Sequence, residues 1–89
     1  MSLTQRKFTA SDLSPGQTYQ VIAAFKDYDG ITHPVGEYWR FVKKSFLPYE
    51  DGLTLFVESA GQAISFRLQW RPESQAQIID NFSDFVLAT

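Results

Sequence analysis

Apolar residues alternate with polar ones in four separate runs, and this period of two is the strongest constraint on the fold. The clearest run places four apolar side chains on one face, namely Ile64, Phe66, Leu68 and Trp70. Alternation of this kind is typical of a β-strand that is buried on one side. The other runs cover residues 17–26, 38–46 and 53–58. We therefore predict a mostly β fold with four to five antiparallel strands.

The connection between the first two runs, residues 27–37, holds the densest set of turn-forming and acidic residues and the only histidine. Asp29 and Gly30 predict a two-residue hairpin turn of type I′, because that turn needs positive φ at both central positions. Pro34 lacks a backbone N–H, which favours an edge or an irregular arm at this point. Residues 27–37 thus serve first as a connection between strands.

After Arg71 the apolar period changes from that of a strand to that of a helix. Pro72 and Glu73 suit a first helical turn, where a missing N–H costs nothing and a negative charge is favourable. An apolar stripe then follows at helical spacing: Ile78, Ile79, Phe82, Phe85 and Val86. We predict an amphipathic helix over residues 73–86. Asn81 and its neighbours can break it, so residues 82–87 are either helix or a short strand.

A chain of 89 residues has room for one hydrophobic core. We expect residues 1–15 to form a flexible or turn-like arm and residues 16–89 to form the single domain. We expect an antiparallel meander of this size with a bent edge arm to curl into a small barrel, with the C-terminal helix covering one face or open end.

Two resemblances to known families add to this prediction. The run Ala24-Phe25-Lys26-Asp27-Tyr28, followed by Val35-Gly36-Glu37, resembles the opening of an SH3 domain. It implies a small SH3-like antiparallel β-barrel. The paired tryptophans and the late Pro-x-x-Tyr motif of the SH3 peptide groove have no counterpart here, so the SH3 ligand is not implied.

The second resemblance spans residues 16–86. It rests on Asp27-Tyr28-Asp29-Gly30, His33-Pro34-Val35-Gly36-Glu37, Trp39, Phe41, Ser45-Phe46-Leu47-Pro48-Tyr49 and Leu68-Gln69-Trp70-Arg71-Pro72-Glu73. These segments resemble an uncharacterised family of small bacterial domains of unknown function. The resemblance implies a bacterial origin and brings no activity with it.

Charge and composition exclude several classes of function. Eight Lys and Arg against ten Asp and Glu give a net charge of −2, whereas nucleic-acid binders usually carry a basic excess. The absence of cysteine rules out disulfides and thiolate chemistry. We see no signal peptide and no apolar run of membrane-spanning length, so we expect a cytoplasmic protein with no membrane partner.

The acidic connection also suggests a divalent-metal or small-ligand site. Asp27, Asp29, His33 and Glu37 are residue types that ligate such ions. The calcium-loop pattern fails, because with Gly30 at its sixth position the first is Phe25 and the twelfth is Gly36. The alternative is that the aspartates cap local N–H groups and that the histidine packs beside Pro34. We predict no cofactor.

Catalytic patterns are missing: there is no nucleophile-elbow motif and no glycine-rich phosphate loop, so we predict that the protein is not an enzyme. Tyrosine, tryptophan and arginine are the residues favoured in binding hot spots. We therefore predict a protein- or peptide-binding module, with Tyr28, His33, Trp39, Tyr49, Arg67 and Arg71 as its binding residues. Two alternatives stay open: Trp39 and Trp70 belong to the core, or the chain is a structural accessory domain or homodimer.

Overall fold

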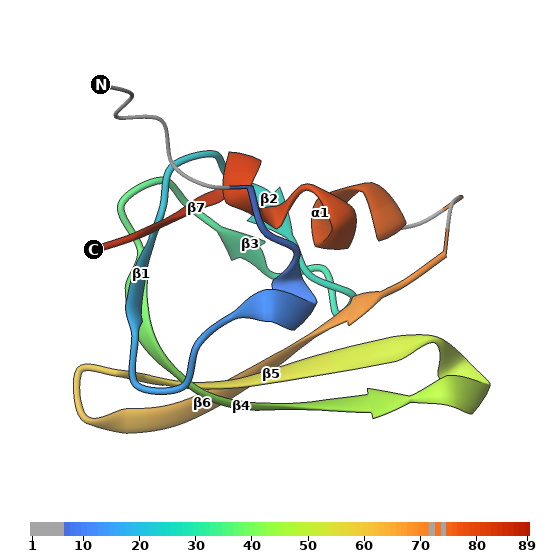
Figure 1. Cartoon of the computed structure of the whole chain (residues 1–89), viewed down its shortest axis with the longest axis horizontal. Coiled ribbons are helices and arrows are strands. Elements are labelled where there is room, and N and C mark those ends of the chain that lie inside the picture. The colour runs from blue at the N-terminus through green and yellow to red at the C-terminus, as the bar shows by residue number, and fades with distance from the viewer. Residues whose placement is uncertain (1–6, 72, 74) are drawn as a thin grey trace.

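A computed structural model describes residues 7–71, 73 and 75–89 of the chain (Figure 1). The strands are β1 (Thr18–Val21), β2 (Phe25–Lys26), β3 (Thr32–His33), β4 (Tyr38–Leu47), β5 (Gly52–Ser59), β6 (Gln62–Gln69) and β7 (Val86–Ala88). The helices are α1 (Ala76–Asp80) and three 3-10 turns, η1 (Ala10–Asp12), η2 (Pro48–Glu50) and η3 (Phe82–Asp84). None of the described helices is long and apolar enough to cross a membrane.

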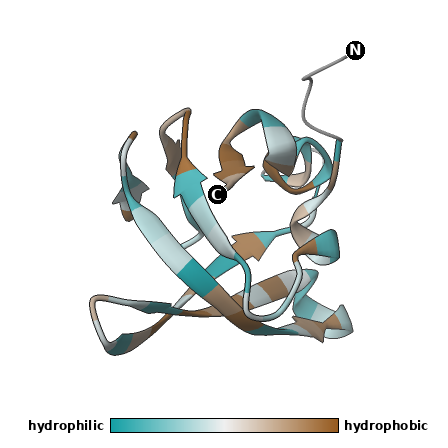
Figure 2. Cartoon of the chain, turned by 60° about the vertical axis from the view of Figure 1, so that its left-hand side comes forward, coloured by the Kyte–Doolittle hydropathy of each residue, from teal (hydrophilic) through white to brown (hydrophobic). Residues whose placement is uncertain are grey.

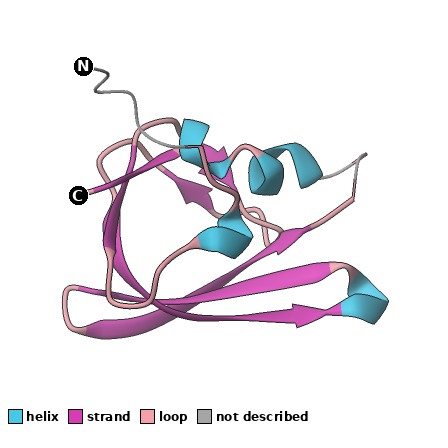
Figure 3. Cartoon of the chain, viewed as in Figure 1, coloured by secondary structure: helices cyan, strands magenta, loops and turns pink. Residues whose placement is uncertain are grey.

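The described strands form two antiparallel sheets (Figure 3). The larger has the order β6-β5-β4-β1-β7, and the smaller pairs β2 with β3. The larger sheet is open, with β6 and β7 at its edges. The prediction of a mostly β, antiparallel fold with one helix is therefore confirmed, whereas a closed SH3-like barrel is not found among the described strands.

The core lies between the curved large sheet and the segments that return over it. Leu53, Leu55 and Val57 of β5 are all buried, as their spacing predicts. Leu55 stands opposite Phe66 of β6, and both side chains face the same core. Figure 2 shows hydrophobic and hydrophilic residues interspersed along the strands, which is the sequence alternation seen in space. Burial on one face is what holds this register.

The run at residues 17–26 is two strands and not one. Its inward residues Tyr19, Val21 and Phe25 are buried as predicted, but the chain bends between β1 and β2. The backbone N–H groups of Ile22 and Ala23 both donate to the carbonyl of Phe85, at 2.7 and 3.2 Å. These bonds take the place of strand-to-strand hydrogen bonds at the bend. The chain therefore leaves the large sheet after β1 and enters the small sheet at β2.

The hairpin between β2 and β3 also differs from the prediction. Asp27 N–H donates to the Ile31 carbonyl at 3.0 Å, and Gly30 N–H donates to the Asp27 carbonyl at 3.1 Å. Of the residues at its tip, Gly30 has positive φ (82°) and Asp29 does not. This is a three-residue loop ending in a glycine bulge, so the type I′ prediction was wrong. Asp27 favours this turn because its Oδ1 accepts the N–H groups of Asp29 and Ile31.

The C-terminal helix is much shorter than the predicted 73–86. α1 ends at Asp80, the backbone N–H of the next residue, Asn81, donates to the Gln77 carbonyl, and η3 follows at once. Residues 86–88 are extended because they pair with β1, with Val86 opposite Val21. The alternative of a short strand at the end of this segment is confirmed. Pro72, which was expected to begin the helix, lies outside the described residues.

The N-terminal segment packs on this body through η1. Ala10 and Leu13 are buried in the core, and the Phe8 ring lies 6.0 Å from that of Tyr19. A capping box starts η1: Thr9 Oγ1 accepts the N–H of Ser11, and Asp12 Oδ2 accepts the N–H of Thr9 at 2.9 Å. Residues 1–6 of the predicted arm lie outside the described part of the chain.

The capping box predicts a small loss of stability in acid. The Thr9 backbone N–H, followed by its hydroxyl, lowers the pKa of Asp12 below its ordinary value of 3.8. A carboxylate with a lowered folded-state pKa contributes stability above the unfolded pKa and loses it as pH falls through the folded value. We expect Asp12→Asn to reduce the acid loss below pH 3.8 by about 0.5–1 kcal/mol, the weak end of capping effects at exposed sites. Urea unfolding between pH 2 and 6 measures it, and parallel pH profiles for the two proteins would contradict it.

Candidate functional site

Four of the six residues predicted to bind a partner line one groove: Tyr28, Tyr49, Arg67 and Arg71. They come from three separate parts of the chain, namely the β2–β3 loop, η2, and β6 with the residues that follow it. The groove has a volume of about 260 Å3, and its remaining lining residues are Leu47, Glu50, Gly52, Thr54, Leu68 and Gln69. We call this the aromatic–arginine groove.

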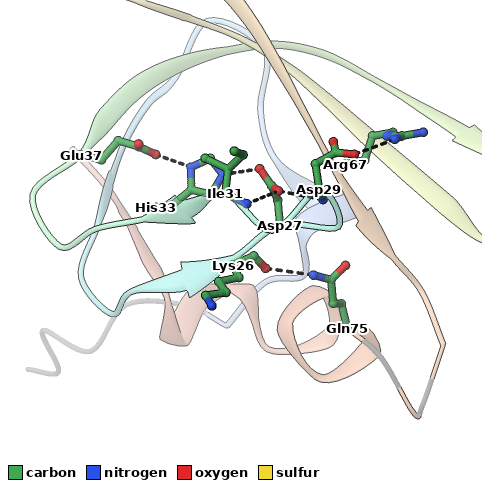
Figure 4. Close-up of polar contacts among 8 residues, drawn as sticks. All are labelled: Lys26, Asp27, Asp29, Ile31, His33, Glu37, Arg67 and Gln75. Carbon is green, nitrogen blue, oxygen red and sulfur yellow. Dashed lines mark hydrogen bonds and ion pairs between the residues drawn. The ribbon is translucent and has the colours of Figure 1, made fainter.

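Tyr28 is fixed beside β6 by its own backbone, since its N–H donates to the Arg67 carbonyl at 2.7 Å. The ring is half exposed, and the Arg67 guanidinium carbon lies 5.5 Å from its centre. A cation over an aromatic face at this distance is attracted by the ring's quadrupole. Arg67 Nη2 also contacts Asp29 Oδ1 at 2.8 Å (Figure 4). Tyr28 and Arg67 thus form one preorganised wall.

Arg71 forms a second cationic point of the groove. Its Nε donates to Asp51 Oδ2 at 2.9 Å. The backbone N–H of Trp70 donates to the Asp51 backbone carbonyl at 2.6 Å. The hydrogen bonds that Arg67 donates to Asp29 and Arg71 donates to Asp51 raise the pKa of both guanidinium groups. Each aspartate contacts a single guanidinium nitrogen, and a guanidinium has five N–H donors. Both arginines are therefore oriented with donors left for a ligand.

Tyr49 stands at the tip of the β4–β5 connection and is 98% exposed. Pro48 starts η2, and Asp51 ends it in the left-handed region at φ 49°. The neighbouring Leu47 is also half exposed. A fully exposed tyrosine contributes little to its own fold, so its ring is available to a partner.

His33 lies elsewhere, in a buried polar cluster (Figure 4). Its Nε2 is 2.9 Å from Asp27 Oδ2, and its Nδ1 is 2.6 Å from Glu37 Oε2. Its ring stacks on Phe25 with centroids 4.8 Å apart. Each ring nitrogen of His33 therefore has a carboxyl oxygen within hydrogen-bond distance. Through these contacts the His33 imidazole links β3 to Asp27 in the β2–β3 loop and to Glu37, just before β4.

This arrangement does not support the metal alternative. Asp27 and Glu37 occupy different nitrogens of the ring, and Asp29 is turned to Arg67. Within residues 7–71, 73 and 75–89, no three acidic or histidine side chains come together as metal ligands. The alternative of local capping describes Asp27 well, because it accepts two backbone N–H groups.

Trp39 also lies away from the groove, in the core. It is 2% exposed, and its ring contacts those of Tyr19 and Phe66 at centroid distances of 5.6 and 5.7 Å. Strand alternation turns it inward together with Phe41. Its Nε1 has no hydrogen-bond partner among the described residues. The core interpretation of Trp39 is therefore correct.

Comparison with known proteins adds the family. Residues 4–87 match the family described as "Domain of unknown function (DUF3601)". The chain belongs to this family. It is also similar to an integron cassette protein from the mobile metagenome of Vibrio cholerae, with 35% sequence identity and a TM-score of 0.85. That match covers 88% of this chain and 87% of the other. No significant match was found among curated proteins.

Membership of the DUF3601 family confirms the resemblance to a bacterial domain of unknown function that residues 16–86 indicated. It assigns no activity, so the site must be judged by its geometry. In this DUF3601 domain, sequence reasoning missed Leu47, Thr54 and Gln69 as groove residues. The signal was present for Thr54, which alternates with the buried Leu53 and Leu55 and so faces the opposite side of the sheet.

A second hollow, of about 540 Å3, lies farther along the large sheet. Val42, Phe56 and Ser65 are among its lining residues. Phe56 stands opposite Ser65, two residues beyond the pair of Thr54 and Arg67 in the aromatic–arginine groove. Residues two apart on a strand share a face. The outward face of β5 and β6 therefore runs from one hollow into the other.

Proposed function

We propose that this domain is a non-enzymatic binding module that holds a peptide segment of a partner protein in the aromatic–arginine groove. One observation carries the proposal: Tyr28, Tyr49 and the pair Arg67 and Arg71 come from three separate parts of the chain and line the same groove. Tyrosine and arginine dominate binding hot spots because they combine large contact area with fixed polar geometry. The arginines are preorganised by Asp29 and Asp51, which reduces the entropy lost on binding.

The environment of the only histidine supports a non-enzymatic role. Both ring nitrogens of His33 are engaged by carboxylates, so neither is free to take a proton from a substrate. The groove itself is lined by two arginines and one carboxylate, that of Glu50, but by neither cysteine nor histidine. Such a surface is suited to recognition of side chains and main-chain carbonyls, and it offers no activated nucleophile.

The experiment is a selection of displayed random peptides on the immobilised full chain, with counter-selection on the Tyr49→Ala/Arg71→Ala variant. We expect peptides whose affinity falls about tenfold or more for either single variant, the size of a hot-spot loss. Thermal unfolding of Tyr49→Ala should match wild type within about 0.5 kcal/mol, because the side chain is 98% exposed.

A matched control is Tyr38→Ala, since Tyr38 is another exposed tyrosine that does not line the groove. It should leave peptide affinity unchanged. Selected peptides that bind the Tyr49 and Arg71 variants as well as wild type would contradict the proposal. So would a Tyr49→Ala protein that unfolds, because the tyrosine would then be structural.

A further inference from the structure

Among the described residues, the second half of β4 has a neighbouring strand on only one side. β1 pairs with Tyr38, Trp39 and Arg40, and backbone bonds from Gly16 and Gln17 reach as far as Phe41. Beyond Phe41, β4 pairs with β5 and, in the described part of the chain, with no other strand. Every residue from 42 to 50 is exposed. Half of one strand edge is thus occupied and the other half is open.

The register identifies the main-chain groups on this open edge. Phe41 donates its N–H to the Gln17 carbonyl at 2.9 Å and accepts from Gly16 N–H at 2.8 Å, so its main-chain groups point away from β5. Phe41 stands opposite Val57, and the register shifts once between Phe41 and Lys43. Alternation along β5 then places Lys44 opposite Leu55 and Phe46 opposite Leu53, in the same orientation as Phe41. The N–H and C=O groups of Lys44 and Phe46 therefore face the open edge.

Lys43 and Lys44 place two positive charges beside this edge, and the Asp12 carboxylate of η1 interacts electrostatically with Lys44. The Lys43 ammonium lies 5.2 Å from the centre of the Phe56 ring, and the Lys44 ammonium donates to the backbone carbonyl and hydroxyl of Ser11. Neither lysine has a carboxylate within ion-pair distance among the described residues. Phe46 and Leu47, both half exposed, add apolar surface on the two faces of the same strand end. Figure 1 shows this end of the β4–β5 ribbon leading into the 3-10 turn that joins the two strands.

We infer that an extended, acidic segment of a partner protein adds as a strand beside Lys44 and Phe46, continuing the line that β1 begins. Main-chain bonds to an exposed edge supply affinity in this mode, and alternate side chains supply specificity. Lys43 and Lys44 select acidic side chains. They also disfavour a second copy of this chain, because pairing the same edge would bring lysines close to lysines. This edge is distinct from the aromatic–arginine groove, with which it shares only Leu47.

The test uses the full chain labelled with 15N and two heptapeptides whose termini are chemically blocked. One peptide alternates glutamate with valine, and the other alternates lysine with valine. The acidic peptide should shift the amide signals of Lys44 and Phe46 and slow their hydrogen exchange by about tenfold. The basic peptide should do neither at the same concentration. Absence of both effects at millimolar acidic peptide overturns the inference, as does equal binding of the basic peptide.

Two variants at one position isolate the backbone contact. Phe46→Pro removes the outward N–H without removing a bond to β5, and proline is tolerated on an edge strand. Phe46→Ala removes the same side chain and keeps the N–H. We expect the acidic peptide to bind the alanine variant and to lose about tenfold in affinity for the proline variant. Equal binding by the two variants overturns the inference.

Two further variants separate this edge from other sites. Lys43→Glu should abolish binding of the acidic peptide even if the proline variant fails to fold. Tyr49→Ala should bind it as wild type does, which distinguishes failure here from failure of the aromatic–arginine groove. Signals that move at Tyr28 and Arg71 instead of Lys44 and Phe46 overturn the inference. Protection of the edge that depends on protein concentration without peptide would show a second copy as the occupant and overturn it as well.

Discussion

Replacing His33 with alanine will cost the domain about 2–4 kcal/mol of unfolding free energy, the combined size of an unsatisfied buried polar group and a lost ring contact. The loss follows from the contacts of the ring: Asp27, whose side chain is 3% exposed, loses the hydrogen-bond partner of its Oδ2. Stacking on Phe25 is lost at the same time. Total stability for a chain of this length is roughly 4–13 kcal/mol. Urea unfolding at pH 7 measures the change.

A double-mutant cycle tests whether the carboxylate is the cause. Asp27→Asn keeps an oxygen to accept the N–H groups of Asp29 and Ile31 but removes the charge, so it should soften the effect of His33→Ala. Glu37→Gln should cost less than Asp27→Asn, because the Glu37 side chain is 30% exposed. Strict additivity of His33→Ala and Asp27→Asn would mean that the buried contact has no coupling energy.

Replacing Phe82 with alanine should have an effect of similar size, about 3–5 kcal/mol, from the lost transfer free energy and the cavity left behind. Phe82 is fully buried, and its ring meets that of Phe25 edge-on at 5.5 Å. Phe82 is the first residue of η3, which links α1 to the edge strand β7. Thermal or urea unfolding measures the loss.

The matched control for Phe82 is the half-exposed Phe46, whose ring contacts only that of Trp70 among the described aromatic rings. Phe46→Ala should cost less than about 1.5 kcal/mol, since little apolar area returns to water. If Phe82→Ala lowered the unfolding free energy as little as Phe46→Ala, the C-terminal segment would not contribute to the hydrophobic core. The structure instead makes it part of the core.

Local patterns predicted the strands well where one face is buried along the whole length. Residues 53–58 alternate without interruption, and β5 holds Leu53, Leu55 and Val57 inward as expected. The helix at 73–86 was overpredicted because an apolar stripe at helical spacing does not reveal a long-range partner. Val86 pairs with Val21, 65 positions earlier in the sequence, and this pairing draws residues 86–88 into the large sheet.

The residues of the candidate site were predictable by type and only partly by position. Tyr28, Tyr49, Arg67 and Arg71 were identified from hot-spot chemistry, and the structure places all four around one groove. For Trp39, alternation grouped it with Phe41 but could not say which face is inward. For His33, the sequence showed acidic neighbours and could not show that two of them lie on different ring nitrogens. Side-chain direction depends on the turn, and a single sequence specifies the turn weakly.

The affinity of wild type and of Tyr49→Ala for one peptide selected on the wild-type domain tests the binding assignment most directly. Calorimetric titration should be made beside thermal unfolding of both proteins. We predict an affinity lower by about tenfold or more for Tyr49→Ala, with an unchanged unfolding midpoint. An unchanged affinity for the variant would contradict the assignment of the aromatic–arginine groove as the binding site.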